Sequence, residues 1–465
     1  MPDKQVSEFS AVKRLMQEAG LPELAIRTFA HYYAELAGGA TGLVAESEIR
    51  PVGEVRSLAA LAESGSAGSE ALAQAVMIKL NGGLGTSMGL NQAKSLLPAR
   101  EGKSFLELIA HQVLVLRRQS GYPLPLILMN SFNTEADSLQ LLSSMPELAA
   151  GQGDLPLSFL QHRVPRLYQD SLAPVNWPED PRREWCPPGH GDLYTALVTT
   201  GLLEQLLARG IRWAFVSNAD NLGASLDPAI LALMAREEIP FLMEVTRRTA
   251  ADRKGGHVAL DLNGRLLLRE SAQCRPEDQP AFQDIERHRY FNTNNLWLDL
   301  KALKETLDAR DGILGLPLIR NLKHVVPEDA STPVVIQAET AMGAAISVFE
   351  GAAIIEVPRT RFAPVKTTSD LLVLWSDRYR LDDAGQVQPT TDQPIRVDLD
   401  PAFYGHIDTF RARFPAGAPS LKQARELTVR GDIHFGADVV IRGRVHLQHD
   451  GDQPRRIGDG EVVEG

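Results

Sequence analysis

Short apolar runs alternate with longer amphipathic stretches from about residue 76 onward. The apolar runs are VMIKL (76–80), LILM (126–129), WAFVSN (213–218), FLMEV (241–245) and VVIQ (334–337). Helix-like segments such as 104–119 and 191–209 lie between them. This alternation predicts an α/β fold of Rossmann-like type, with a mixed, mainly parallel sheet covered by helices on both faces. In such folds ligands bind at the carboxyl ends of the strands.

The first 63 residues show a different pattern. Apolar residues such as Ile26, Phe29 and Tyr33 recur at helix-face spacing, so residues 1–63 are predicted to be helical. The Gly/Ser-rich stretch 64–69 then predicts a flexible connector, although a mobile loop within the main domain has the same composition. We therefore expect an N-terminal helical extension over residues 1–70 and the main domain over residues 71–385.

The pattern changes again beyond about residue 385, where apolar residues recur every six positions. One register contains Leu427, Ile433, Val439 and Val445, continued by Ile457 and Val463, and a second contains Val429, Phe435, Ile441 and Leu447. Hexad repeats are typical of a parallel β-helix, although ordinary strands of period two would produce some of the same matches. The expectation for residues 386–465 is a C-terminal β-helix domain.

Composition narrows the function classes. The chain has 465 residues, which exceeds the size of one compact core, and its formal net charge of -11 disfavours a nucleic-acid-binding surface. Cys186 and Cys274 lie far apart in sequence and outside any metal-ligand spacing, which fits a reducing compartment. The polar N-terminus and the lack of a long apolar run predict a cytoplasmic protein with no membrane association.

A glycine-rich loop carries the clearest chemical signal. The segment KLNGGLGTSMG (79–89) directly follows the first apolar run, and Lys94 comes five residues later. Glycines let backbone amides approach an anion closely, so the loop can hold phosphates while Lys94 supplies a positive charge. The spacing matches neither the Walker A motif nor the dinucleotide-binding GxGxxG motif. Taken alone, the segment is also compatible with a glycine-rich surface turn.

Together with this loop, seven further segments resemble the eukaryotic-type UTP–glucose-1-phosphate uridylyltransferases, or UDP-glucose pyrophosphorylases. They are LMNSFNT (128–134), PPGHGDLY (187–194), FVSNADNLGA (215–224), MEVTRRTAADRKGG (243–256), FNTNNLWL (291–298), ETAMGAAI (339–346) and PRTRFAPVKTTSDLL (358–372). The segments follow the family's order over about residues 76–385, and the hexad tail stands in its expected place, where the family has a left-handed parallel β-helix. The resemblance implies a nucleotidyltransferase catalytic domain over residues 71–385.

The implied reaction joins UTP and glucose 1-phosphate, giving UDP-glucose and pyrophosphate by in-line attack on the α-phosphate. The resemblance also implies Mg²⁺ as the cofactor, and it is compatible with a homo-oligomer. One alternative is the same chemistry on another sugar 1-phosphate, either galactose or N-acetylhexosamine. A second alternative is a non-catalytic assembly scaffold, which is disfavoured because Lys94, Asp220 and Lys366 are all present.

Because the reaction brings two polyanions together, charge neutralisation and positioning are its main requirements. Asp220 follows an apolar strand, where a turn aspartate is equally common, and the resemblance assigns Mg²⁺ to it. The resemblance also directs Lys94 to the triphosphate and Lys366 to the α-phosphate, where a solvated surface lysine would be the ordinary alternative.

The remaining site residues are implied by the same segments. The predicted nucleotide-binding residues are Leu80, Asn81, Gly82, Gly83, Lys94, Gln161, Gly189, Asp220 and Lys366. The side-chain amide of Gln161 can pair with both a donor and an acceptor on the uracil edge, and the resemblance implies that the Gly189 backbone packs against the base. The predicted sugar-phosphate-binding residues are His190, Asn218, Glu244, Gly256, Asn292, Asn294 and Glu339.

Overall fold

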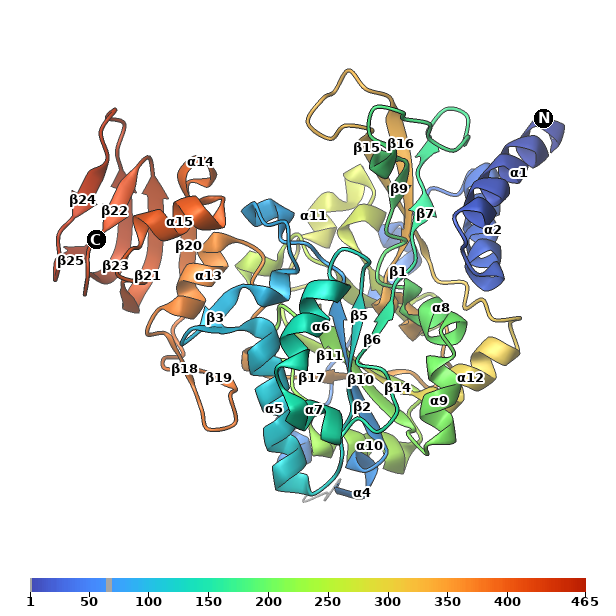
Figure 1. Cartoon of the computed structure of the whole chain (residues 1–465), viewed down its shortest axis with the longest axis horizontal. Helices are drawn as coiled ribbons and strands as arrows, with labels where there is room; N and C mark the ends of the chain where they lie inside the picture. The colour runs from blue at the N-terminus through green and yellow to red at the C-terminus, as the bar shows by residue number, and fades with distance from the viewer. Residues whose placement is uncertain (1, 64–68) are drawn as a thin grey trace.

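A mixed β-sheet runs through the centre of the computed structural model, which describes residues 2–63 and 69–465 (Figure 1). Within those residues its ten strands are β1 (Ile49–Pro51), β2 (Ala75–Asn81), β5 (Leu126–Asn130), β6 (Ser158–Leu160), β10 (Trp213–Asn218), β11 (Phe241–Arg247), β12 (His257–Asp261), β13 (Leu266–Arg269), β14 (Tyr290–Asp299) and β17 (Ala353–Glu356). Strands β10, β2, β5 and β6 run parallel, as do β11 and β17, while β14 is antiparallel to both β10 and β11. The predicted α/β fold with a mixed sheet is confirmed.

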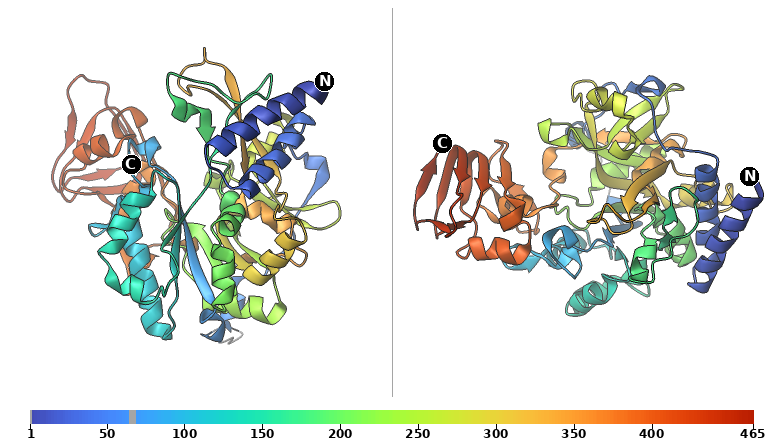
Figure 2. Two further views of the ribbon diagram at one scale, coloured as in Figure 1. Left: turned by 45° about the vertical axis from the view of Figure 1, so that its right-hand side comes forward. Right: turned by 90° about the horizontal axis from the view of Figure 1, so that it is seen from above.

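Alternate residues of the central strands face opposite sides of the sheet, which creates two hydrophobic cores. Ala75 and Met77 of β2 pack into one core, and Val76 and Ile78 pack into the other. Residues of α5 (Phe105–Ser120), α10 (Pro228–Glu237) and α13 (Thr368–Trp375) complete the first core, and residues of α8 (Asp192–Thr199), α9 (Leu202–Ala208) and α12 (Leu300–Asp308) complete the second. Helices therefore cover both faces of the sheet (Figure 2).

Two of the predicted elements differ in detail. The helical stretch 191–209 is divided into α8 and α9 at Gly201, whose φ of 71° lies in the left-handed region that glycine adopts without strain. The VVIQ run forms β16 (Val334–Thr340), but this strand belongs to a separate antiparallel sheet with β15 (Leu318–His324) and β8 (Leu167–Tyr168). The expectation that it joins the parallel sheet is wrong, because the preceding strand folds back on it as a hairpin.

The N-terminal region is helical only in part. Helices α1 (Pro2–Glu18) and α2 (Glu23–Ala37) confirm the prediction, but residues 38–57 form loops, a 3-10 turn (Glu46–Glu48) and strand β1, which pairs with β12. The helical prediction is wrong there because Gly38 and Gly39 follow the end of α2 and the extended segment gains a sheet partner. After α3 (Leu58–Glu63), residues 64–68 of the predicted connector lie outside the described residues, and Ser69 begins α4 (Ser69–Leu72).

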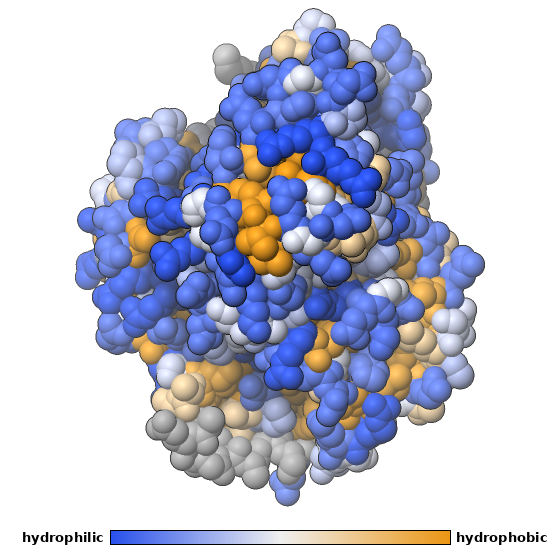
Figure 3. All heavy atoms as spheres, turned by 90° about the vertical axis from the view of Figure 1, so that its left-hand side faces the viewer, coloured by the Kyte–Doolittle hydropathy of each residue, from blue (hydrophilic) through white to orange (hydrophobic). Residues whose placement is uncertain are grey.

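The C-terminal strands lie at the opposite end of the molecule from α1 and α2 (Figure 1). Strands β20 (Arg396–Leu399), β21 (Ser420–Arg430), β23 (Val440–Gln448) and β25 (Val462–Glu464) pair in parallel, and so do β22 (Ile433–Phe435) and β24 (Arg455–Ile457). Every residue of the two predicted hexad registers from 427 to 457 is buried. The surface at this end is mostly hydrophilic around one apolar area (Figure 3). The hexad pattern therefore identified parallel strands with an apolar interior.

The C-terminal strands share a hydrophobic core with the main domain. Tyr404 of α14 (Pro401–Tyr404) and Phe410 of α15 (Ile407–Arg413) belong to the same buried cluster as Leu371 of α13 and as Met88, which lies within the glycine-rich segment. In addition, the ring of His406 lies directly against Gly89. The tail is thus packed onto the region that precedes Lys94, while the boundary at residue 385 stays a prediction.

Acidification is expected to destabilise this fold through two histidines, His257 and His190, whose pKa values are lowered in the folded chain. Burial, and then the charge of His288, lowers the pKa of His257 well below its usual value, and burial lowers the pKa of His190 to about 4. Unfolded histidines titrate near 6.5 and take up protons that the folded chain refuses, so stability present above about pH 6.5 is lost as the pH falls. We expect the free energy of unfolding, measured with urea, to drop by about 1–3 kcal/mol between pH 7.5 and 5.5.

A His257→Phe variant supplies the control for this pH dependence. Phenylalanine fills the same space beside Phe282 and His288 but does not titrate. The variant should therefore lose less stability than the parent over the same pH interval. A free energy of unfolding that stays constant, or rises, on acidification of the parent chain would contradict the assignment.

Candidate functional site

The glycine-rich loop begins where β2 ends and lies against Gln161. A Cβ atom at Gly82 would come within 2.8 Å of the Gln161 amide nitrogen, so glycine at this position lets the loop lie directly against the Gln161 side chain. The Gly82 carbonyl accepts a hydrogen bond from the Ser131 hydroxyl at 2.9 Å. The side chain of Asn81 is turned into the protein and donates to Asn130 and Ser138. The structure thus brings the loop and Gln161 together, as the motifs predict, with the Asn81 amide engaged in protein contacts.

The loop that carries His190 is fixed to the end of β16. The amide of Gly191 donates to the Thr340 carbonyl at 2.9 Å, and the amide of Thr340 donates to the Pro188 carbonyl at 3.0 Å. Gly189 has a φ of 78°, and an added Cβ would collide with the Thr340 backbone and lie 3.1 Å from Cβ of Glu339. Glycine is therefore required at position 189, and Glu339 lies directly beside it.

The hydrogen bonding of His190 determines which proton it can offer. Its Nδ1 accepts a hydrogen bond from the Met342 amide at 2.8 Å. Burial lowers the pKa of His190 to about 4, so the imidazole is neutral at neutral pH. A neutral ring that accepts at Nδ1 carries its hydrogen on Nε2. His190 can therefore donate one hydrogen bond to a phosphate oxygen without carrying a charge.

Asp220 and Lys94 form an ion pair at the carboxyl end of the central strands. Asp220 follows β10, Lys94 begins the 3-10 turn η3 (Lys94–Leu96), and Lys94 Nζ donates to Asp220 Oδ2 at 2.7 Å. The second carboxylate oxygen of Asp220, Oδ1, is buried and has no hydrogen-bond partner. An unpaired buried carboxylate oxygen costs free energy unless a cation or a donor satisfies it. This atom is suited to coordinate a metal ion.

The residues around Asp220 limit which kind of metal site is feasible. No group of three or more His, Cys, Asp or Glu residues suited to hold a metal ion occurs in the parts of the chain that the structure describes. Mg²⁺ commonly takes only one or two protein carboxylates and completes its coordination with water and substrate phosphates. Asp220 alone therefore fits Mg²⁺ held together with a phosphate ligand, and it does not fit an all-protein site.

Lys366 approaches Asp220 through the backbone. The amide of Val365 donates to the Asp220 carbonyl at 3.2 Å, and the amide of Lys366 donates to Asp370 Oδ2 at 2.9 Å. Thr367 caps helix α13, with Asp370 as its capping-box partner. The Lys366 side chain itself is exposed. The structure thus places the predicted metal carboxylate and the predicted α-phosphate lysine on two segments that are hydrogen-bonded to each other.

Three of the predicted sugar-binding residues also gather near Lys366. The Asn292 amide donates to the Gly256 carbonyl at 3.2 Å, and Asn292 Nδ2 donates to Asn294 Oδ1 at 2.9 Å. The Glu270 carboxyl group lies directly against Gly256. Burial raises the pKa of Glu270, while the charge of Lys366 and a hydrogen bond with Asn292 oppose the rise. Glu270 is therefore a fourth residue of this cluster.

Sequence reasoning missed two residues here, Glu270 and Lys79. Glu270 lies outside every recognisable motif, and no local pattern marks it. Lys79 opens the glycine-rich segment, but its side chain is fully buried and donates to the Ser217 hydroxyl at 2.7 Å and to the Ala224 carbonyl at 2.8 Å. Burial lowers the pKa of Lys79 to about 7. Lys79 thus joins β2 to the end of β10 beneath the loop.

The last two candidates occupy different surroundings. Asn218 ends β10 beside Leu80 of β2, so both stand at the carboxyl ends of neighbouring parallel strands. Glu244 is 0% exposed, and its two carboxylate oxygens accept four hydrogen bonds from Asn295, Trp297 and Arg361. All of these hydrogen bonds come from the protein, so the Glu244 carboxylate offers a sugar no accessible acceptor. We therefore do not place glucose on Glu244, although the motifs predict that it binds the sugar.

Comparison with known proteins shows which family the chain belongs to. The family model of UTP–glucose-1-phosphate uridylyltransferase matches residues 26–442. The Saccharomyces cerevisiae UTP–glucose-1-phosphate uridylyltransferase is 40% identical over 395 residues, which cover 84% of this chain and 77% of the yeast protein. The chain therefore belongs to the UTP–glucose-1-phosphate uridylyltransferase family, and the family and the transferase activity predicted from the motifs are confirmed.

Solved structures give the same result for the fold. The crystal structure of a UDP-glucose phosphorylase from Trypanosoma brucei matches with a TM-score of 0.91 and 44% identity, covering 98% of both chains. A variant of the Leishmania major UDP-glucose pyrophosphorylase in complex with UDP-glucose matches with a TM-score of 0.92 and 43% identity, again over 98% of both chains. Each similarity extends over nearly the whole chain, including the C-terminal strands.

Proposed function

We propose that this chain forms UDP-glucose and pyrophosphate from UTP and glucose 1-phosphate by in-line attack on the α-phosphorus of UTP. A phosphate oxygen of glucose 1-phosphate forms the new P–O bond while the bond to the β-phosphate oxygen breaks and pyrophosphate leaves. The attacking group is already an anion, so no general base is needed. The observation that carries the proposal is the convergence of Lys94, Asp220 and Lys366 at the carboxyl ends of β2 and β10.

Each charged residue has a distinct part in this scheme. The amides of Gly82 and Gly83 and the ammonium group of Lys94 hold the triphosphate, which is where repulsion between the two substrates is greatest. Lys366 extends from the segment bonded to Asp220 and stabilises the charge that develops on the α-phosphate. Asp220 would hold Mg²⁺, which would neutralise phosphate charge and orient the reacting group.

Neutral and acidic hydrogen-bonding groups select the base and the sugar. Gln161 and the Gly189 backbone recognise uracil, because an amide and a fixed backbone penalise a base with a different edge. His190 donates its Nε2 hydrogen to the sugar phosphate. Gly256, Asn292, Asn294 and Glu270 form the cluster that offers hydrogen bonds to the glucose hydroxyls. Asn218 of β10 and Glu339 of β16 complete the residues proposed to bind the sugar phosphate.

Measuring pyrophosphate release with a panel of substrates tests this function. We expect rapid release only with UTP plus glucose 1-phosphate, and loss of at least about two orders of magnitude in kcat/KM when ATP or GTP replaces UTP, since unmatched buried groups are costly. Preference for galactose 1-phosphate or an N-acetylhexosamine phosphate would redirect the proposal to that sugar. Absence of release with every pair would favour the scaffold alternative.

Lys94→Ala is expected to weaken the use of UTP. Removing the ammonium group removes one positive charge that would balance the triphosphate, and it leaves Asp220 without its ion-pair partner. We expect kcat/KM for UTP to fall by about 10²–10³ while the melting temperature shifts by only a few degrees. The exposed Lys301→Ala supplies the control for loss of a lysine. A folded Lys94→Ala chain with parental UTP affinity and turnover would remove Lys94 from the site.

Three further features belong to this proposal. The C-terminal strands close into a short left-handed β-helix, supported by their parallel pairing and by registers such as Leu427↔Val445, which join residues three hexads apart. A homo-oligomer is also part of the proposal, for which Val462 of the outermost strand β25, 45% exposed, offers an apolar contact. The protein acts in the cytoplasm. Among the described residues, no helix has both the length and the apolar character needed to cross a membrane.

A further inference from the structure

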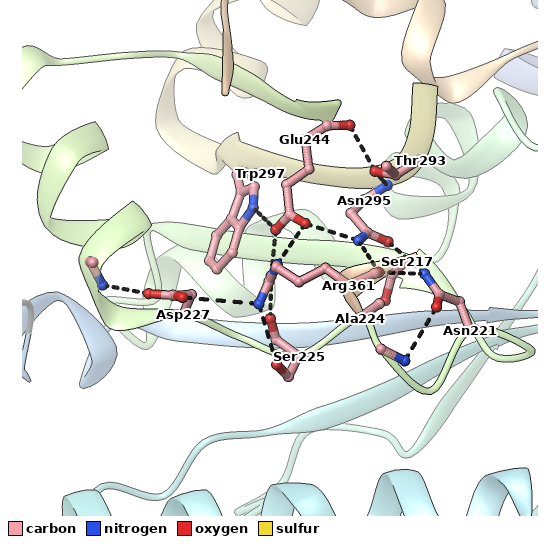
Figure 4. Close-up of polar contacts among 12 residues, drawn as sticks. Ser217, Asn221, Ala224, Ser225, Asp227, Glu244, Thr293, Asn295, Trp297 and Arg361 are labelled. Atoms are coloured by element: carbon pink, nitrogen blue, oxygen red, sulfur yellow. Dashed lines mark hydrogen bonds and ion pairs between the residues drawn. The ribbon is translucent and has the colours of Figure 1, made fainter. Parts of the chain in front are cut away.

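The segments that carry Asp220 and Lys366 rest on a buried polar network (Figure 4). Its centre is Arg361, in the 3-10 turn η9 (Arg359–Arg361), whose side chain points at Glu244 of β11. Arg361 Nε donates to Glu244 Oε2 at 2.9 Å, and a terminal guanidinium nitrogen donates to Glu244 Oε1 at 2.5 Å. The same nitrogen donates to the Ser225 carbonyl at 2.6 Å. Arg361 therefore links the sheet to the loop that follows Asp220.

Asn221, the residue after Asp220, uses all four hydrogen-bonding positions of its side chain. Its Oδ1 accepts from the Ala363 amide at 3.0 Å and from the Gly223 amide at 3.2 Å. Its Nδ2 donates to the Arg361 carbonyl at 3.1 Å and to Asn295 Oδ1 at 3.3 Å. Two of these partners belong to the segment that leads to Lys366. One amide, only 1% exposed, thus bridges the Asp220 loop and the Lys366 segment.

The two backbones approach each other closely at this bridge. An added Cβ at Gly223 would collide with the Thr360 carbonyl, so glycine is required for the approach. Residues Asn221 and Pro364 form an isolated β-bridge, and Val365 donates to the Asp220 carbonyl. Any displacement of residues 361–365 therefore shifts Lys366 relative to Asp220.

Stability alone is a weak explanation for so many polar groups. Replacing a buried ion pair by well-packed apolar residues is often neutral or stabilising, and buried polar groups are best attested as devices that fix one register. Here the donors and acceptors are distributed over the Asp220 loop, the Lys366 segment and strands β11 and β14. Their arrangement specifies how the Lys366 segment lies on the Asp220 loop.

We infer that Asn221 and the Arg361–Glu244 pair are positioning residues for uridylyl transfer, which hold Lys366 in register with Asp220 and act on the reaction only through the Lys366 side chain. The inference rests on the proposed roles of Lys366 and Asp220. It assigns Glu244 a function different from sugar binding. It also predicts a specific kinetic signature, because misplacing a group that acts on the transition state lowers turnover more than ground-state binding.

A double-mutant cycle on the full-length enzyme tests this inference. Asn221→Ala is expected to lower kcat at least about thirtyfold while the KM values for UTP and glucose 1-phosphate change less than about threefold. In a Lys366→Ala background the same substitution should lower kcat less than about threefold, because the ammonium group that Asn221 positions is already absent. Additive effects, or an Asn221→Ala chain with parental kcat, would overturn the inference.

Gln112→Ala is the matched control. Gln112 is also buried and donates to the backbone of the same loop, at the Leu222 carbonyl, but it bonds no residue of the Lys366 segment. It should lower the melting temperature without lowering kcat at a temperature where the chain is folded. Equal losses of kcat in Gln112→Ala and Asn221→Ala would reduce Asn221 to a general structural residue and contradict the inference.

A second variant covers the case in which Asn221→Ala does not fold. Arg361→Lys keeps the charge opposite Glu244 but cannot form the two-pronged bond or reach Ser225 at the same time. We expect kcat to fall at least about tenfold, again less than additively with Lys366→Ala. Parental kcat in Arg361→Lys would contradict the inference. If Lys366→Ala itself kept parental turnover, the proposed function of Lys366 would fail instead, so the two failures are distinguishable.

Discussion

Asp220→Asn is expected to lower turnover by at least about a hundredfold, equivalent to about 2.7 kcal/mol of transition-state stabilisation, while leaving the fold intact. Asparagine keeps the size of the side chain and can still accept from Lys94, so the local geometry is retained. It lacks the negative charge that a Mg²⁺ ion requires beside the unpartnered Oδ1. Turnover should be measured for both proteins across a Mg²⁺ titration.

Asp299→Asn provides a matched control for that experiment. Asp299 ends β14 and is paired with Arg212 at 2.7 Å, the same distance that separates Asp220 from Lys94. It lies beside Trp213, at the opposite end of β10 from Asp220. This variant should lose stability but keep its turnover and Mg²⁺ dependence. If Asp220→Asn also kept both, Asp220 would be only a turn residue and the metal site would lie elsewhere.

Lys366→Ala is expected to lower kcat by about 10²–10³, with a much smaller change in the KM for either substrate. The reason is that Lys366 bears on the charge that develops at the α-phosphate rather than on the ground-state complex. Its exposure means that truncation creates no cavity and leaves no buried group unpaired. Initial rates over a matrix of both substrates separate the two constants.

The fold should be unaffected by that substitution, which melting curves can verify. A variant with unchanged kcat and a raised KM would show that Lys366 binds substrate and transition state equally. A variant with parental values of both constants would exclude Lys366 from the site. Lys301→Ala, on an exposed helix face, controls for loss of surface charge.

The periodicity of apolar residues predicted where strands form better than it predicted which strands pair with each other. The apolar runs became β2, β5, β10 and β11 because each is buried on both faces, and the hexads became parallel strands because each sixth residue points inward. Strand β16 was assigned to the wrong sheet, since a strand's own sequence does not encode which strand lies beside it. The same argument applies to β1, whose pairing with β12 depends on residues more than 200 positions away.

The candidate site shows a similar division. The motifs led to Lys94, Asp220 and Lys366, and the structure brings their segments together. Glu270 escaped notice because it reaches the site from the end of β13 without a local pattern. The motifs identified the segment that contains Glu244 but gave no sign that its side chain is buried in an ion pair. Its partner Arg361 is 117 residues away, and only the tertiary structure shows that the pair is closed to a ligand.

A crystal structure of the enzyme bound to UDP-glucose tests the central claim most directly. The account predicts uracil against Gly189 and Gln161, and the glucose hydroxyls within hydrogen-bond distance of Asn292, Asn294 or Glu270. It predicts that Lys366 lies within about 3 Å of the α-phosphate and that Glu244 stays bonded to Arg361 away from the sugar. A product bound elsewhere, or bound here with Lys366 and Asp220 both remote from its phosphates, would contradict the account.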